Sequence, residues 1–184
     1  REWHGVDDEE LAEQLQRGDR RALAPLVERH YDALIGYAYR LTYGDRALAE
    51  DLVQETFLRV LRGISSYQFP RPFKPWLYAI ATNLARNHYA SADQRRTSSD
   101  EVDDLPDAEE PDTFIIAHDE QQRVIAALRS LPDHHREVII LAYYQSLTLA
   151  EIADTLHIPL GTVKSRLSNG IARLREKMKA YAAT

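Results

Sequence analysis

The final third of the chain contains two helical segments with a short interruption between them, from Thr148 to Met178. Thr148 and Glu151 have the spacing of a capping box, in which the hydroxyl and the carboxylate each accept a hydrogen bond from a free backbone N–H of the first turn. Residues 157–161 (HIPLG) interrupt the helical pattern, because proline lacks a backbone donor and glycine permits a turn. The segment therefore predicts a helix-turn-helix.

The second of these helices, expected from about Thr162, has two different faces. One face is an apolar stripe at helical spacing, formed by Val163, Leu167, Ile171, Leu174 and Met178. At about 100° per residue, the other face carries hydroxyl, amide and basic side chains. Such groups suit contacts to base edges and phosphates, whereas a solvated surface helix is the alternative. The candidate DNA-binding residues are Thr162, Lys164, Ser165, Arg166, Ser168, Asn169 and Arg173.

Composition excludes several classes of function. The 184 residues contain no cysteine, which removes disulfides, thiolate metal sites and cysteine nucleophiles. The histidines, including His134 and His135, lack a metal-binding spacing, and no glycine-rich phosphate loop is present, so no metal or cofactor is expected. No apolar run approaches the roughly 20 residues that span a membrane, and the acidic N-terminus lacks a signal-peptide pattern. We therefore expect a cytoplasmic protein without membrane insertion.

The net charge of −6 is unevenly distributed. Residues 1–96 are neutral overall, residues 97–120 carry −10, and residues 121–184 carry +4. The acidic segment is rich in Asp, Glu, Ser and Pro and lacks periodicity, which is typical of a flexible linker. Apolar spacing elsewhere is helical. The sequence thus predicts an all-α protein with two small helical domains, 1–96 and 121–184, joined by the acidic linker 97–120.

Four helices are expected in the first domain, at residues 7–16, 22–42, 47–62 and 77–90. Tyr31 is expected on the inner, core-facing side of the second. The polar face of the third carries Asp51, Gln54, Glu55, Arg59 and Arg62. Periodicity alone favours a solvated surface for these five residues, because most helices expose a charged face to water.

Residues 64–76 (ISSYQFPRPFKPW) combine prolines, aromatic residues and cations. The prolines predict a loop rather than a helix or strand. Its aromatic side chains either fill the core or, beside the cations, form stacking platforms for single-stranded nucleic acid. Trp76 is more typical of a core residue that supports the loop. The candidate residues of the loop and the next helix are Tyr67, Phe69, Arg71, Phe73, Lys74, Trp76, Asn83, Arg86 and Asn87.

Three stretches together resemble the extracytoplasmic-function sigma factors of the bacterial sigma-70 family. DLVQETFLRVL resembles the helix of region 2.2, SYQFPRPFKPWLYAIATNLARNHY resembles regions 2.3 and 2.4, and the stretch from Ser130 to Met178 resembles region 4. The run W-L-Y-x-I-A-x-N and the run G-T-V-K-S-R, separated by an acidic linker, are specific in combination. The resemblance covers nearly the whole chain.

The resemblance implies roles that periodicity does not reveal. Asp51, Gln54 and Glu55 match positions that dock on the β′ coiled coil of core RNA polymerase, and Arg59 shares their face. The proline-rich loop matches the loop that captures a flipped base at the minus-ten element, where stacking offsets an unstacking cost of a few kcal/mol. Region 4 implies minus-thirty-five recognition and contact with the β flap, and Asn169 would suit adenine. An anti-sigma factor is a further implied partner.

The sequence therefore predicts a promoter-specificity subunit without enzymatic activity. One alternative is a helix-turn-helix regulator that binds a palindromic site as a dimer without polymerase. A second alternative is an all-α enzyme with an appended DNA-binding domain, but no paired titratable groups support it. The acidic linker is interpreted either as a segment that enters the polymerase cleft or as a plain tether.

Overall fold

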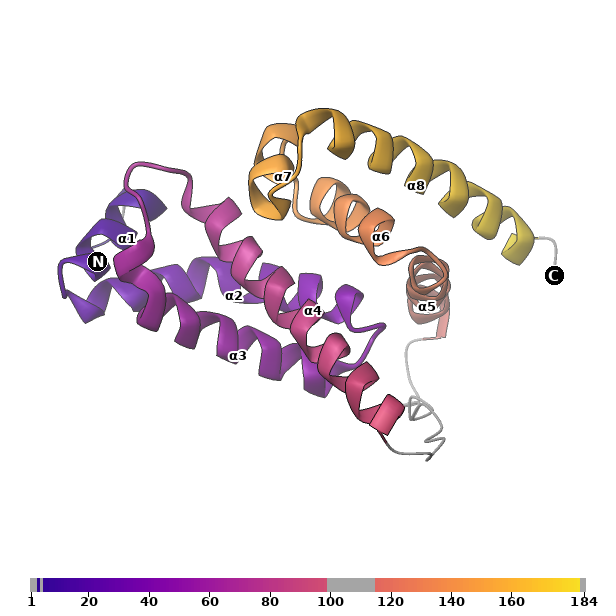
Figure 1. Ribbon diagram of the computed structural model, residues 1–184, viewed down its shortest axis with the longest axis horizontal. Coiled ribbons are helices and arrows are strands. Elements are labelled where there is room, and N and C mark those ends of the chain that lie inside the picture. The colour runs from indigo at the N-terminus through magenta and orange to yellow at the C-terminus, as the bar shows by residue number, and fades with distance from the viewer. Residues whose placement is uncertain (1–2, 4, 99–114, 183–184) are drawn as a thin grey trace.

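A computed structural model describes residues 3, 5–98 and 115–182, and all regular elements of this described part are helical (Figure 1). Helices α1 to α4 lie together as one group, and α5 to α8 form a second group beside α4. The prediction of an all-α fold is confirmed. Within the described residues, no helix is both long enough and apolar enough to cross a membrane.

The first two helices pack through regularly spaced leucines. Helix α1 (Asp8–Gln16) begins at Asp7, whose carboxylate accepts a hydrogen bond from the Glu10 N–H at 2.8 Å. The short turn η1 (Arg20–Ala22) leads into α2 (Leu23–Leu41). The apolar sides of α1 and α2 meet in the core through Leu11, Leu15, Leu26 and Leu34.

Helices α3 (Arg46–Gly63) and α4 (Phe73–Ser98) complete the first group. Between them lie the turn η2 (Ile64–Ser66) and the proline-rich loop. The loop is shorter than predicted, because α4 already begins at Phe73 rather than Leu77. Pro75 is tolerated there, since the N–H groups of a first helical turn have no partner within the helix. Helix α4 also extends to Ser98, beyond the predicted end at Ala90.

The second group contains α5 (Ile115–Arg129), α6 (Asp133–Ile139), the π-helical segment η3 (Ile140–Tyr144), α7 (Leu149–Leu156) and α8 (Leu160–Ala182). Because α4 ends at Ser98 and α5 begins at Ile115, these two helices overlap the two ends of the predicted linker 97–120. The linker's central residues, 99–114, lie outside the described residues. Helix α8 begins two residues before the predicted Thr162.

The two groups share one apolar core. Helix α4 packs against α7, and α2 packs against η3. Tyr78 of α4 and Ile140 of η3 are both fully buried in the same cluster. The C-terminal group therefore covers part of α4, which carries candidate DNA-binding residues.

Candidate nucleic-acid interface

The helix-turn-helix has the local geometry that its sequence predicts. The Glu151 N–H donates to the Thr148 hydroxyl at 3.2 Å, and the Thr148 N–H donates to the Glu151 carboxylate at 2.7 Å. His157 ends α7 in the left-handed conformation, with φ of 53°. The N–H groups of Thr162 and Val163 then donate to the Pro159 carbonyl as α8 begins. The capping box is confirmed and fixes where α7 begins.

The predicted division of α8 into two faces is also observed. Val163 is fully buried, and the later residues of its apolar stripe are half-buried. On the other side, hydroxyl, amide and basic groups face solvent together, while Thr162 and Arg166 are half-buried at its edge. The exposed members of this recognition face are Lys164, Ser165, Ser168, Asn169 and Arg173.

Gly170 allows α8 to lie directly against α6. A β-carbon at this position would come within 2.9 Å of Ile139 Cδ1 and 3.2 Å of His135 Cβ. His135 is buried there, and its pKa is lowered first by burial and then by the charges of His134, Arg173 and Arg166. Sequence inspection did not single out Gly170, because its role depends on the packing of two helices.

The aromatic residues of the proline-rich loop divide into supporting and exposed groups. Tyr67 and Phe73 are buried, and Trp76 is half-buried. Their rings pack together with centroids 5.3 to 6.0 Å apart. The expectation that Tyr67 and Phe73 offer free stacking surfaces does not fit this burial, because both rings already pack in the core. Phe69, by contrast, is 43% exposed.

Helix α1 holds the loop in place. The Gln16 amide donates to three carbonyls, those of Ile64, Ser65 and Tyr67, at 2.9 to 3.2 Å. The Glu9 carboxylate accepts from the Phe73 N–H at 2.8 Å, at the start of α4. Burial, reinforced by the nearby acidic residues of α1, raises the pKa of Tyr67 to about 12. The Tyr67 hydroxyl donates to the Arg71 carbonyl, so the loop is fixed from within.

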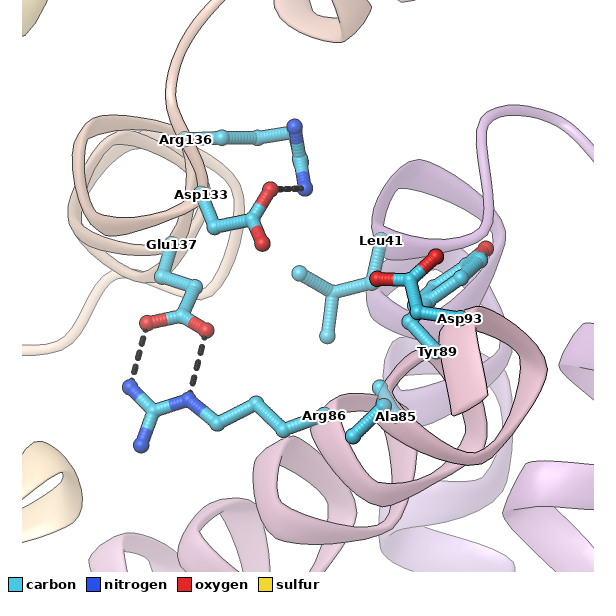
Figure 2. A pocket seen from close by; sticks show the side chains of 9 residues that line it. Leu41, Ala85, Arg86, Tyr89, Asp93, Asp133, Arg136 and Glu137 are labelled. Atoms are coloured by element: carbon cyan, nitrogen blue, oxygen red, sulfur yellow. Dashed lines mark hydrogen bonds and ion pairs between the residues drawn. The ribbon is translucent and has the colours of Figure 1, made fainter. Parts of the chain in front are cut away.

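The polar candidates of the loop and α4 differ in what they contact. Arg71, Asn83 and Asn87 face solvent. Lys74 instead donates from Nζ to the Gln145 carbonyl at 2.7 Å. Arg86 donates to both carboxylate oxygens of Glu137, at 2.8 and 2.5 Å, as Figure 2 shows. The C-terminal group therefore occupies both α4 cations of the predicted minus-ten set.

A small cavity of about 210 Å³ lies beside the Arg86–Glu137 pair (Figure 2). Arg136 lines it and is itself buried, donating to Asp133 at 2.6 Å and to the Tyr43 hydroxyl at 3.0 Å. The bidentate bond to Glu137 raises the pKa of Arg86 further above its usual range, despite partial burial. The two groups of helices thus meet through charged as well as apolar contacts.

An apolar groove lies on the outer side of α2 and α3. It has a volume of about 340 Å³ and is bordered by Gln54, one of the predicted polymerase-binding residues. Tyr31 and Leu58 are 37% and 43% exposed there, so the prediction that Tyr31 lies in the core is wrong. An indication of this exposed apolar surface in the sequence is Leu58, an apolar residue that falls outside the core-facing apolar stripe of α3. The other lining residues are Leu23, Val27, Phe57 and Leu61.

The predicted polymerase-binding residues lie along α3 next to this groove. Asp51, Gln54 and Arg59 are exposed, and Glu55 is half-buried. Glu55 accepts from Arg59 at 3.2 Å and lies 3.7 Å from Arg62. Such exposed ion pairs contribute little to stability, so these charges remain available for a partner.

Comparison with known proteins places both halves of the chain in one family. Residues 26–96 match the family model of sigma-70 region 2, and residues 127–176 match that of sigma-70 region 4. The chain is 32% identical to the ECF RNA polymerase sigma factor SigW of Bacillus subtilis, over 90% of this chain and 94% of the relative. The chain belongs to the ECF sigma factors of the sigma-70 family. It is also 32% identical to the ECF RNA polymerase sigma-E factor of Escherichia coli, over 88% of this chain and 89% of that protein.

Solved sigma factor structures have the same fold as this sigma factor. CnrH, in complex with the cytosolic domain of CnrY, is 28% identical with a TM-score of 0.73, covering 94% of this chain and 97% of CnrH. RpoE from Bartonella quintana, in complex with the anti-sigma factor NepR, is 26% identical with a TM-score of 0.73, covering 85% and 96%. Both relatives are therefore described in complexes rather than alone.

In the part of the chain that the structure describes, no group of three His, Asp or Glu side chains is arranged to hold a metal ion. The first cavity described above is lined by charged and apolar side chains of α2, α4 and α6, and the second is lined mainly by apolar side chains of α2 and α3. The predicted contact residues lie on three surfaces: the recognition face of α8, the loop with α4, and the side of α3 beside the groove.

Proposed function

We propose that this sigma factor acts in the cytoplasm as a subunit without catalysis, directing core RNA polymerase to promoters through two DNA contacts. The observation that carries the proposal is the order of regions 2 and 4 along the chain, together with the solvent-facing polar side of α8. A dimeric regulator is less favoured, because the region 2 half accounts for the loop, α4 and the groove at once.

The recognition face of α8 supplies the proposed minus-thirty-five contact. Its exposed hydroxyl and amide groups form the centre, and basic residues lie at its edges. A helix of this kind enters the major groove, where an amide such as that of Asn169 pairs with adenine in two hydrogen bonds. The proposed contacts are Thr162, Lys164, Ser165, Arg166, Ser168, Asn169 and Arg173.

The loop and α4 supply the proposed minus-ten contact. Phe69 is the exposed ring available for stacking on a flipped base, and Arg71, Asn83 and Asn87 are free to face the strand. Lys74 and Arg86 belong to the same proposed set, and in this structure both also contact the C-terminal group. Tyr67, Phe73 and Trp76 hold the loop in shape.

The groove of α2 and α3 is the proposed docking surface for the β′ coiled coil of polymerase. Its exposed apolar side chains, Tyr31 and Leu58, lie next to the polar edge formed by Asp51, Gln54, Glu55 and Arg59. An apolar centre with a polar rim is the usual anatomy of a protein interface. The helix-turn-helix half would contact the β flap, and an anti-sigma partner would compete for these surfaces, as the family implies.

Run-off transcription with bacterial core polymerase and a genomic fragment library tests the proposal. We expect discrete start sites that require this protein and vanish in the Asp51→Ala, Gln54→Ala, Glu55→Ala variant. The matched control, Glu120→Ala with Glu176→Ala, removes the same number of acidic groups at exposed sites elsewhere and should keep the start sites. Specific duplex binding by the free protein without new start sites would instead establish a regulator.

A further inference from the structure

Helix α1 contacts both ends of the proline-rich loop, although it lies outside the residues that match region 2. That match begins at residue 26, whereas α1 covers Asp8–Gln16. The helix lies beside η2 and the start of α4, on either side of the loop (Figure 1). The roles that the family resemblance implies therefore do not account for its contacts to the loop.

Gln16 holds the first end of the loop. Its side chain is exposed, yet its amide nitrogen donates to the carbonyls of Ile64, Ser65 and Tyr67 at 2.9 to 3.2 Å. Carbonyl oxygens only accept hydrogen bonds, so these partners determine the orientation of the amide. An exposed side chain adds little to the core, and the amide therefore acts mainly on the path of the loop.

Glu9 holds the second end. Its carboxylate accepts from the Phe73 N–H at 2.8 Å, where α4 begins. The first N–H groups of a helix have no acceptor within that helix, so Glu9 acts as a cap that another helix supplies. Glu9 and Gln16 thus fix the two ends of the segment 68–72.

Between these attachments, the chain forms one closed turn with Phe69 exposed on it. The Arg71 N–H donates to the Gln68 carbonyl at 2.8 Å, and Phe69 and Pro70 lie between these two residues. The Tyr67 hydroxyl donates to the Arg71 carbonyl and closes the segment further. The position of Phe69 therefore follows from where the two ends are held.

Helix α1 is attached to the bundle independently of the loop. Leu11 and Leu15 are buried in the core. The Asp8 carboxylate accepts hydrogen bonds from Arg29 at 2.9 Å and from His30 Nε2 at 2.6 Å, both on α2. Loss of one contact to the loop should consequently leave α1 in place.

We propose that Glu9 and Gln16 are positioning residues for minus-ten recognition, which hold the loop in the shape that presents Phe69 to an unstacked base. The inference rests on the proposed function, because it requires that the loop receives a base of the single strand. A loop that is ordered before binding avoids the cost of ordering it in the complex. It also offers one arrangement of contacts rather than several, so that one base is preferred over the others.

Strand binding by the assembled holoenzyme tests the role of Gln16. Core polymerase is combined with the parent or variant chain, and anisotropy is measured with a short labelled strand that carries the minus-ten sequence of a promoter found by run-off transcription. Gln16→Ala should weaken binding about five- to tenfold, the net value of about one hydrogen bond. Gln14→Ala makes the same change roughly 200° around α1 and should weaken binding less than about twofold.

Two substitutions at Glu9 separate its hydrogen bond from its charge. Glu9→Ala removes the acceptor of the Phe73 N–H and should weaken binding about fivefold. Glu9→Gln keeps an acceptor oxygen, so its affinity should stay within about twofold of the parent chain. Glu10→Ala removes the same charge from an exposed neighbour and should not weaken binding. Tighter binding in all three variants would show that only charge repulsion matters and would overturn the proposal.

Base selectivity distinguishes positioning from a general loss of folding. Each base of the minus-ten element is replaced in turn, and the dissociation constant of the replaced strand is divided by that of the original strand. At the base that the parent chain discriminates most, Gln16→Ala and Glu9→Ala should reduce this ratio at least about threefold, whereas Glu9→Gln should retain it. A partly unfolded variant would bind both strands less by the same factor, so an unchanged ratio overturns the proposal.

The outcomes separate this inference from the function on which it rests. If the parent chain directs run-off transcription and binds the strand, but Gln16→Ala and Glu9→Ala behave as the parent does, the positioning role is refuted and the proposed function stands. If the parent chain adds no start sites, the proposed function fails and the positioning role fails with it. Weaker binding with reduced selectivity, both restored in Glu9→Gln, supports the positioning role.

Discussion

The proposed DNA-binding faces of α8 and α4 are built from the same kinds of side chain but differ in what covers them. On α8, Lys164 and Asn169 face solvent, and the opposite stripe packs on neighbouring helices. On α4, Asn83 and Asn87 face solvent, yet Arg86 is held by a carboxylate from another part of the chain. Residue type alone therefore does not decide whether a cation is free to bind DNA; the packing partner of its helix does.

The difference also affects how much a cation on each face contributes to folding stability. A cation on α8 contributes little to folding, because exposed charges are well solvated. Arg86 contributes to folding by neutralising a buried carboxylate. Substitutions at the two faces should consequently have different effects on stability and on binding.

The largest expected effect is on duplex binding through the exposed face. Lys164→Ala together with Asn169→Ala should weaken binding to a minus-thirty-five duplex, taken from promoters found by run-off transcription, by about 100-fold, because one phosphate and one base contact are lost. Fluorescence anisotropy measures this loss. Lys177→Ala, an exposed cation near the end of α8, is the control and should bind nearly as well as the parent chain. Equal losses in both variants would show that only net charge matters.

The next effect compares the same type of change on the two faces. Arg86→Ala should lower the free energy of unfolding by about 2 kcal/mol, less than a fully buried pair would lose, because water reaches half of the arginine side chain. Lys164→Ala should change it by less than about 0.5 kcal/mol. Urea unfolding of both variants in one buffer gives the two values. Similar values would contradict the distinction between a covered and an open face.

The smallest effect concerns alkaline pH. The pKa of Tyr67 is raised to about 12, so its contribution to stability is complete below the ordinary tyrosine pKa of about 10 and is lost as the pH rises through about 12. Tyr67→Phe should therefore reduce the decrease in urea midpoint between about pH 8 and pH 11. Tyr181→Phe, at an exposed site on α8, should leave the decrease unchanged. If the parent chain and both variants show the same decrease in urea midpoint, the burial of Tyr67 is not the cause of that decrease.

Local patterns predicted the helix-turn-helix well, because its determinants lie close together in the sequence. The Thr148–Glu151 box and the stripe from Val163 depend on three- and four-residue spacings, which a helix fixes. The pair between Arg86 and Glu137 joins residues 51 positions apart and depends on how two halves pack, which no spacing reveals. The burial of Tyr67 likewise depends on α1, which supplies the amide that holds its carbonyl.

The candidate surfaces show the same limit. Polar residues on α3 were identified from their shared face, but the groove beside them was not, because it requires α2 to leave Tyr31 and Leu58 uncovered. The resemblance to a family supplied roles for these residues that physical patterns alone did not. The structure adds the packing of Tyr67 against Phe73 inside the loop and the ion pair between Arg86 and Glu137.

Because Gly170 has no side chain, the direction of α8 depends on how closely this helix can approach α6. Because Ile139 and His135 lie so close, even one methyl group would act as a wedge between α8 and α6. Helix α8 would then tilt as a rigid unit, with the largest displacement at the end far from the contact. A change at this position would therefore alter the direction of every side chain on the recognition face together. Under the proposed function, a substitution at Gly170 would alter promoter preference while every proposed base-contacting residue stays unchanged.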